Sequence, residues 1–373
     1  MKINILQGAF FPIPPTKGGA IETAWFELGK EFVRQGHQVT HVSRKEKGLK
    51  NSEEINGVNH IRVRGANAVK NPYILKLLEL PYVIRARKVM QAGDIMVSHA
   101  FWAPILFPKR RFGNQYVHVG RYPKGQLRLY RNAARFQVPS NSIAKICNLQ
   151  IPQQAAKIKT LPYPLTWNPL SILDFQEKEK VVLYAGRIHP EKGIKPLIEA
   201  WCQLPDTVVR DWTLRLIGPY KEEQGGGGIK FLNLLKRNIE QSKNKVEFYD
   251  PIFDRNLLKN EMNKAQLFIY PSLAKDGETF GLAVLEAMSC GCVPIVSALP
   301  CFLDFISNRV EGFCLKQSAN ENLSKILKEE LVEILTYKKS NINKMALASL
   351  TRAKDYELSN VAQKYIADFS SLL

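Results

Sequence analysis

Short apolar runs alternate along the chain with longer amphipathic segments. Apolar or β-branched runs of about four to eight residues predict buried strands, and apolar residues at helical spacing predict helices. In the first half, a helix is expected over residues 20–35. The predicted strands of this half are Ile3–Leu6, Gln38–Ser43, His60–Val63, Asp94–Ser98, Gln115–Val119 and Arg135–Val138. Strands that alternate with helices indicate a parallel sheet with helices on both faces.

A proline-rich segment at 162–170 (PYPLTWNPL) separates this half from a second half with the same alternation. Proline interrupts both helices and strands, so the segment is predicted to be a linker. The strands predicted beyond it are Lys180–Ala185, Trp212–Ile217, Val246–Tyr249, Gln266–Tyr270 and Val293–Val296. A chain of 373 residues also exceeds the ~250–300 residues that one core usually serves.

We therefore expect an α/β protein made of two Rossmann-like, doubly wound domains. The first domain covers residues 1–165 and the second covers residues 166–354. A final helix over about 355–373 is expected to pack back on the first domain.

The positive charge is concentrated in the first half of the chain. The formal net charge is +19, and residues 1–165 hold 26 lysines and arginines against 8 acidic residues. Such an excess points to an anionic partner. Five basic residues recur every three or four positions and would form one stripe on a helix: Arg121, Lys124, Arg128, Arg131 and Arg135. Another basic cluster, at 85–88, follows the apolar segment LLELPYVI.

This pairing of basic and apolar residues favours peripheral contact with an anionic membrane, although a solvated surface without a partner is the alternative. The start of the chain has no secretory signal pattern, and no apolar run is long enough to span a bilayer. The six cysteines are scattered and lack zinc-site spacing, which predicts no metal site and a reducing, cytoplasmic compartment. The expected localisation is cytoplasmic, with peripheral contact at the cytoplasmic membrane face.

Candidate binding residues follow the predicted strands, because ligands of doubly wound sheets bind beyond the carboxyl ends of the strands. After the strand KVVLYA comes Gly186, which allows close approach to the backbone, and then Arg187 and Lys192 before a predicted helix. Two cations at a helix start form a candidate diphosphate site. The alternative is that Arg187 and Lys192 are solvated side chains of a loop and bind no ligand.

A second loop follows the strand QLFIY and places Glu278 and Glu286 eight residues apart. Glu286 lies in an apolar predicted helix, so burial of its carboxylate would require a hydroxyl or cationic partner. Two acceptor groups suit a ligand rich in hydroxyls. Backbone N–H groups of 280–282 could hold a phosphate between them. The alternatives to ligand binding are that a glutamate only caps the helix, or that it forms a structural ion pair within the protein.

Two glycine-containing loops are more ambiguous. Gly18 and Gly19 precede the first helix and allow close approach of a ligand, while Glu22 could bind an acceptor or could simply stabilise the helix start. The run at 225–228 lacks the residues of a phosphate loop and is interpreted as a flexible loop tip.

Taken in order and spacing, these motifs resemble family 4 of the retaining glycosyltransferases, which have the GT-B fold of two Rossmann-like domains facing a cleft. The shared features are the Gly-Gly-x-x-Glu loop, Gly186-Arg187 followed by Lys192-Gly193, and Glu278 followed by Glu286 and Ala-Met-Ser-Cys-Gly291. The resemblance runs through nearly the whole chain and is strongest over 180–300.

The resemblance implies a role for each motif residue. The catalytic set would be His99, Glu278, Arg187 and Lys192, with His99 contacting the donor sugar near the reacting carbon. Donor binding would involve Gly186, Arg187, Lys192, Glu278, Thr279, Phe280, Gly281, Leu282 and Glu286, with Glu278 on the transferred sugar and Glu286 on the ribose. The acceptor or phosphate loop would include Gly18, Gly19, Glu22 and His118.

The implied function is transfer of a hexose, glucose first, from UDP-glucose to a saccharide or lipid-linked acceptor in polysaccharide or glycolipid synthesis. Asp250 and Pro251 replace a glycine that the family often has near the base, which leaves the base open. The chain contains no Asp-x-Asp motif, so neither a metal nor another cofactor is expected. A UDP-sugar epimerase of the same fold and a nucleic-acid-binding protein are the alternatives, the latter without a recognised module.

Overall fold

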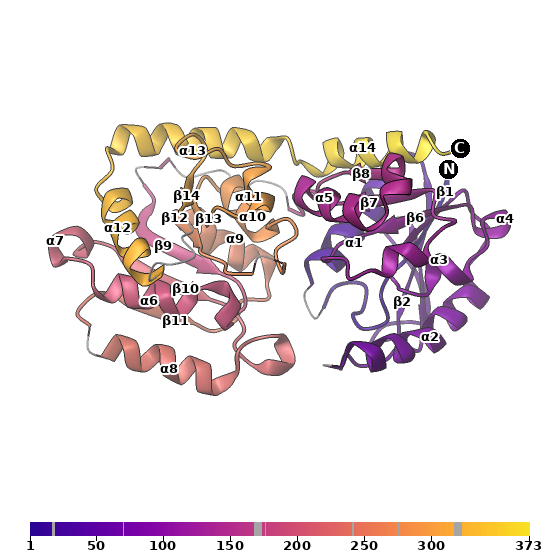
Figure 1. The fold of residues 1–373 in the computed structure, drawn as a ribbon, viewed down its shortest axis with the longest axis horizontal. Helices are drawn as coiled ribbons and strands as arrows, with labels where there is room; N and C mark the ends of the chain where they lie inside the picture. Colours follow the sequence, from indigo (N-terminus) through magenta and orange to yellow (C-terminus); the bar gives the residue numbers. More distant parts are fainter. Residues whose placement is uncertain are drawn as a thin grey trace. The chain divides into compact units, whose positions relative to one another are not determined.

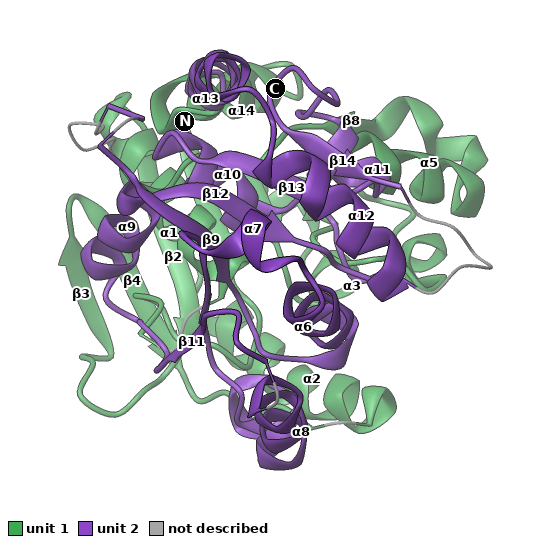
Figure 2. Ribbon diagram, turned by 90° about the vertical axis from the view of Figure 1, so that its left-hand side faces the viewer, with its two compact units in different colours: residues 1–167, 356–373 green, residues 168–355 purple. Residues whose placement is uncertain are grey.

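The computed structural model describes residues 1–16, 19–69, 71–167, 174–175, 177–240, 242–274, 276–316 and 323–373. The chain divides into two compact units, shown in different colours in Figure 2. Unit 1 contains residues 1–167 and 356–373, and unit 2 contains residues 168–355. Each unit has its own sheet and its own helices, and each is described separately below.

Figure 1 shows residues 1–167 of unit 1 in indigo to magenta and its last helix in yellow. Unit 1 is built on an eight-stranded sheet with the order β3-β4-β2-β1-β5-β6-β7-β8. All neighbouring strands are parallel except β3 and β4. The strands are β1 (Lys2–Leu6), β2 (Gln38–Arg44), β3 (Ser52–Ile55), β4 (Val58–Val63), β5 (Ile95–Ser98), β6 (Asn114–His118), β7 (Arg135–Val138) and β8 (Ile158–Thr160). The helices are α1 (Ala20–Arg34), α2 (Pro72–Val89), α3 (Ala103–Leu106), α4 (Lys109–Phe112), α5 (Asn141–Gln150) and α14 (Leu358–Ser370), with short 3₁₀ turns η1 (Gln126–Leu129) and η2 (Pro152–Lys157).

Besides a cluster around Phe136 of β7 and Ile143 of α5, two further apolar clusters hold this sheet between its helices. One joins Trp25 and Phe32 of α1 to Tyr365 and Phe369 of α14. The other packs Tyr82 of α2 with residues of α4 and of strands β1, β2, β4 and β5. The last helix of the chain thus completes the core of unit 1, because its aromatic side chains cover the α1 side of the sheet.

Unit 2 has a six-stranded, fully parallel sheet with the order β11-β10-β9-β12-β13-β14. The strands are β9 (Glu179–Ala185), β10 (Thr213–Ile217), β11 (Val246–Tyr249), β12 (Ala265–Tyr270), β13 (Val293–Ser297) and β14 (Phe313–Leu315). The helices are α6 (Ile194–Cys202), α7 (Asp206–Val209), α8 (Gly228–Glu240), α9 (Arg255–Lys264), α10 (Leu282–Ser289), α11 (Pro300–Leu303), α12 (Leu323–Leu335) and α13 (Lys339–Lys354), with 3₁₀ turns η3 (Pro190–Lys192) and η4 (Glu222–Gln224).

The predicted α/β class with doubly wound parallel sheets is confirmed, and every strand predicted from the sequence is present. The predicted basic stripe is wrong. Arg121 lies in the loop after β6, Arg128 lies in η1, and Arg135 lies in β7. The residues therefore share no helix, because Pro123 and Gly125 interrupt the segment before η1 and the chain turns into a strand after it.

Candidate functional site

Two loops at the carboxyl edge of the unit 2 sheet meet through a buried ion pair. Lys192, at the end of η3, contacts the carboxylate of Glu278 from the loop after β12. Their side chains are only 6% and 9% exposed. Ser272 donates its hydroxyl to the same Glu278 oxygen at 3.0 Å, and the Lys192 ammonium lies 5.5 Å from the centre of the Tyr270 ring. The structure thus brings together two of the residues singled out in the sequence.

Glycine allows these loops to approach closely. Gly193 has a φ of +71°, and a Cβ at this position would collide with the carbonyl oxygen of Pro271. A side chain at Gly186 would press against the Tyr184 hydroxyl. Both glycines are therefore needed for the loop after β9 to fold against the end of β12.

Arg187 lies at the exposed side of the same edge, with 43% of its side chain exposed. It donates to the carbonyl of Gly225 at 2.7 Å and pairs with Glu191 at 2.8 Å. The interpretation of 225–228 as a flexible loop tip is wrong. The run forms a closed turn whose four N–H groups all donate to backbone carbonyls, and one of its own carbonyls holds Arg187.

Glu286 is buried in α10, and Arg255 of α9 lies 3.4 Å from its carboxylate. A cationic neighbour therefore does accompany this buried acid. Helix α10 begins after Gly281, whose φ of +100° places a hypothetical Cβ against the ring of Phe302. Leu282 is the first residue of the helix, and Thr279 and Phe280 precede it, with Phe280 buried against Phe305.

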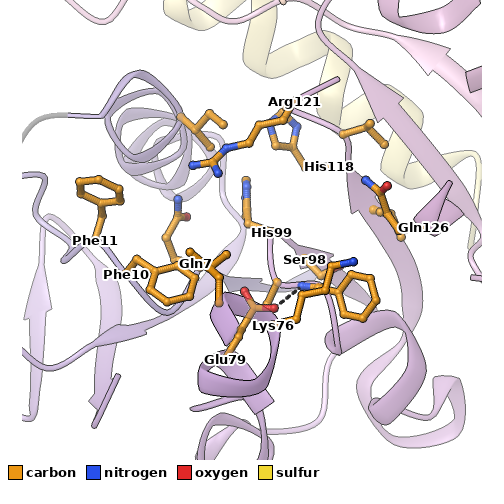
Figure 3. Close-up of a pocket in the computed structure, with 18 of the residues that line it drawn as sticks. Gln7, Phe10, Phe11, Lys76, Glu79, Ser98, His99, His118, Arg121 and Gln126 are labelled. Carbon is orange, nitrogen blue, oxygen red and sulfur yellow. Dashed lines mark hydrogen bonds between the residues drawn. The ribbon is translucent and has the colours of Figure 1, made fainter. Parts of the chain in front are cut away.

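Unit 1 contains a separate pocket of about 260 Å³ (Figure 3). It lies where β1, β5 and β6 end, and Lys76 and Glu79 of α2 form part of its wall. Several aromatic side chains line it as well: Phe10, Phe11, Phe101 and Tyr130. The pocket therefore combines flat apolar surfaces with charged groups.

His99 and His118 both line this pocket, but they differ in their partners. Both ring nitrogens of His118 are occupied, one by Gln137 and the other by the Tyr163 hydroxyl at 2.8 Å. Neither ring nitrogen of His99 has a hydrogen-bond partner, although the ring packs on Trp25. Burial lowers the pKa of His99 and lowers the pKa of His118 to about 4, so both rings are neutral near pH 7.

Other polar atoms around the same pocket also lack partners. The hydroxyl of Ser98 is buried without a hydrogen bond, as are the ring nitrogens of His99. A buried polar group without a partner costs roughly 1–3 kcal/mol. Water or a polar ligand in the pocket would supply the hydrogen bonds that Ser98 and His99 lack.

The predicted loop before α1 is described only in part. Gly18 lies outside the described residues, whereas Gly19 precedes α1 and Glu22 lines the unit 1 pocket. A side chain at Gly19 would collide with the Glu22 carboxylate. Burial raises the pKa of Glu22, although the charge of Arg121 acts in the opposite direction.

Sequence reasoning missed Glu79. Its carboxylate accepts a hydrogen bond from the backbone N–H of Phe101 at 2.7 Å, and burial raises its pKa to about 7 (Figure 3). The signal in the sequence was a single acidic residue inside the apolar segment LLELPYVI. Across the described parts of both units, no group of three or more His, Cys, Asp or Glu could hold a metal ion.

Comparison with known proteins agrees with this architecture. Residues 170–340 match the family described as glycosyl transferases group 1. The chain is 25% identical to a lipopolysaccharide 1,2-N-acetylglucosaminetransferase of Salmonella typhimurium, over 98% of this chain and 97% of that protein. It is 26% identical to the GDP-mannose:cellobiosyl-diphosphopolyprenol alpha-mannosyltransferase of Xanthomonas oryzae pv. oryzae, over 52% of this chain and 47% of that protein.

Among solved structures, the chain is similar to Alr3699/HepE of Anabaena in complex with UDP and glucose. The TM-score is 0.72 at 19% identity, and the alignment covers 100% of both chains. The family match over residues 170–340, the full-length glycosyltransferase relative and the shared fold support a glycosyltransferase with the GT-B fold.

Proposed function

We propose that the enzyme transfers a hexose, glucose first, from a UDP-sugar to a hydroxyl of a saccharide or lipid-linked acceptor. Transfer retains the configuration of the sugar and requires no divalent metal. One observation carries the proposal. Arg187, Lys192 and Glu278 lie on the loops after β9 and β12 at the carboxyl edge of the unit 2 sheet, and Glu286 lies on α10, the helix that follows the second of these loops.

Each group has a role in this proposal. Arg187 and Lys192 hold the diphosphate, aided by N–H groups at the start of α10, and they stabilise the charge that develops on it as the sugar leaves. Glu278 accepts hydrogen bonds from the transferred hexose, and Glu286 accepts them from the ribose. The acceptor hydroxyl attacks the reacting carbon of the sugar from the same face that the diphosphate leaves. Correct positioning of the two substrates supplies most of the rate acceleration.

The unit 1 pocket is proposed to bind the acceptor saccharide. Sugar rings present apolar C–H faces and polar edges, which suits the aromatic side chains beside the unpaired atoms of Ser98 and His99. The carboxylate of Glu22 lines the same pocket and accepts a further hydrogen bond from a hydroxyl of the saccharide. His118 positions the pocket wall, because its hydrogen bonds are already used within the protein.

The choice of donor is tested by calorimetric titration with UDP, GDP, ADP, UDP-glucose and GDP-mannose, each with and without EDTA. Both UDP and GDP are worth including, because HepE was solved with UDP and the Xanthomonas relative is named for GDP-mannose. We expect binding of UDP and UDP-glucose that EDTA leaves unchanged. Preference for GDP-mannose would contradict the donor assignment, and binding that EDTA abolishes would contradict the metal assignment.

We further propose that α2 contacts an anionic membrane. Tyr73 and Leu77 are 76% and 65% exposed, and Ile74 and Ile84 are also exposed on this helix. The last turn of α2 adds Arg87 and Lys88. An exposed apolar surface next to basic residues suits the boundary between acyl chains and anionic headgroups.

A further inference from the structure

The loop after β9 contains an acidic residue between its cations. One carboxylate oxygen of Glu191, Oε1, lies 2.8 Å from Arg187 Nη2, 3.7 Å from His189 Nδ1 and 3.9 Å from Lys192 Nζ. A single oxygen therefore faces all three basic side chains of residues 186–193. This is the arrangement that an oxygen of a bound phosphate would adopt.

The Glu191 backbone is held by a hydrogen bond, whereas its side chain is partly exposed to solvent. Its carbonyl accepts a hydrogen bond from Leu273 N–H at 2.8 Å, which ties the loop to the segment after β12. Its side chain is 37% exposed, in contrast to the buried Glu278. Rotation of the carboxylate into solvent would thus leave the loop in place, and half-exposed ion pairs of this kind are weak.

We propose that Glu191 is a competing anion, whose carboxylate neutralises Arg187 in the donor-free enzyme and is displaced by the diphosphate. The inference rests on the proposed role of this loop in donor binding. One terminal nitrogen of Arg187 donates to the Gly225 carbonyl and the other donates to Glu191, so a phosphate that binds this guanidinium competes with the Glu191 carboxylate. Glu191 then lowers the affinity for the donor and speeds release of the nucleoside diphosphate, because it recaptures Arg187 as the product leaves.

The test is calorimetric titration of the full-length enzyme and of Glu191→Gln with UDP and with inorganic pyrophosphate. Glutamine retains the size of the side chain and a hydrogen-bond acceptor but removes the charge. We expect Glu191→Gln to bind both ligands roughly 1.4- to fivefold more tightly, the range set by a weak, half-exposed ion pair. Glu191→Ala should show a gain of the same sign.

A matched control is Glu199→Gln. Glu199 lies on α6 in the same unit, is 34% exposed and pairs with Lys195 at 3.5 Å, but it contacts neither Arg187 nor Lys192 in the described structure. The Glu199→Gln variant should bind UDP with the affinity of the wild type. A gain of the same size in Glu199→Gln would show a general effect of net charge and would overturn the inference.

The variant Arg187→Ala distinguishes a failure of the proposed role of Glu191 from a failure of the proposed donor site. Unchanged or weaker binding in Glu191→Gln, with UDP binding that still depends on Arg187, overturns only the role of Glu191. UDP binding that survives Arg187→Ala overturns the donor site itself, and the inference with it.

Discussion

The two cations of the proposed donor site differ in how deeply they are buried. Replacement of Lys192 by alanine would leave the carboxylate of Glu278 buried without its cation, which typically costs about 3–5 kcal/mol. Replacement of the half-exposed Arg187 should cost less than about 1 kcal/mol. Urea unfolding of both variants measures this difference. Equal losses of unfolding free energy would contradict the buried character of the Lys192–Glu278 pair.

Some residues of the candidate sites could be predicted from the sequence alone, and others could not. Arg187, Lys192, Glu278 and Glu286 could be selected because each follows or flanks a predicted strand within a short segment. Glu79 could not, because its role depends on α2 packing against the backbone of Phe101, 22 residues away. The unpaired state of His99 is likewise a property of the packed structure, since no local pattern reveals it.

Among the elements, the long buried strands were the easiest to predict. Strands covered on both faces consist of nearly continuous apolar residues, as in β9 and β12. The three strands that were not predicted, β3, β8 and β14, are only three or four residues long. In β3 the sequence SEEI has one apolar residue, so the hydrogen bonds to β4 could not be inferred from its composition.

Buried histidines on the strands of unit 1 make the folding stability of the protein depend on pH. His41, His60, His99 and His118 lie in or directly after β2, β4, β5 and β6, and burial lowers the pKa of each. The unfolded chain takes up protons below about pH 6.5, whereas the folded chain resists protonation until about pH 4 at His60 and His118. Folding stability should therefore fall as the pH drops from about 6.5 towards 4.

The expected loss is roughly 2 kcal/mol for each of His60 and His118 between pH 6.5 and 5, at about 1.4 kcal/mol per pKa unit. Glu79 and Glu22 partly offset it, because burial raises the pKa of each carboxyl and so favours folding as the pH falls. Urea unfolding at pH 7 and pH 5 measures the sum. His60→Phe, which removes ring nitrogens that have no partners, should reduce the slope. A slope that is flat in the wild type, or unchanged in this variant, would contradict the account.

For the molecule as a whole, the basic excess and the exposed apolar side chains of α2 predict binding to anionic vesicles. Within the described ranges, none of the helices has the length and apolar character that a bilayer-spanning segment needs. The enzyme should sediment with phosphatidylglycerol vesicles but not with phosphatidylcholine vesicles, and Tyr73→Asp with Leu77→Asp should reduce binding at least tenfold.

A control for these substitutions is Leu347→Asp in α13 of unit 2, since Leu347 is 64% exposed and lies far along the sequence from α2. It should leave vesicle binding unchanged. Equal binding to both kinds of vesicle, or equal loss in the α2 and α13 variants, would argue against α2 as the membrane surface.

The central claim is that unit 2 binds a nucleoside diphosphate through Arg187 and a ribose through Glu286. Calorimetric titration of UDP into the wild type, Arg187→Ala and Glu286→Gln tests it most directly, with unfolding curves to show that the variants fold. Loss of a charge-assisted hydrogen bond should weaken binding about tenfold or more in each variant. Wild-type affinity in both folded variants would contradict the proposed donor site.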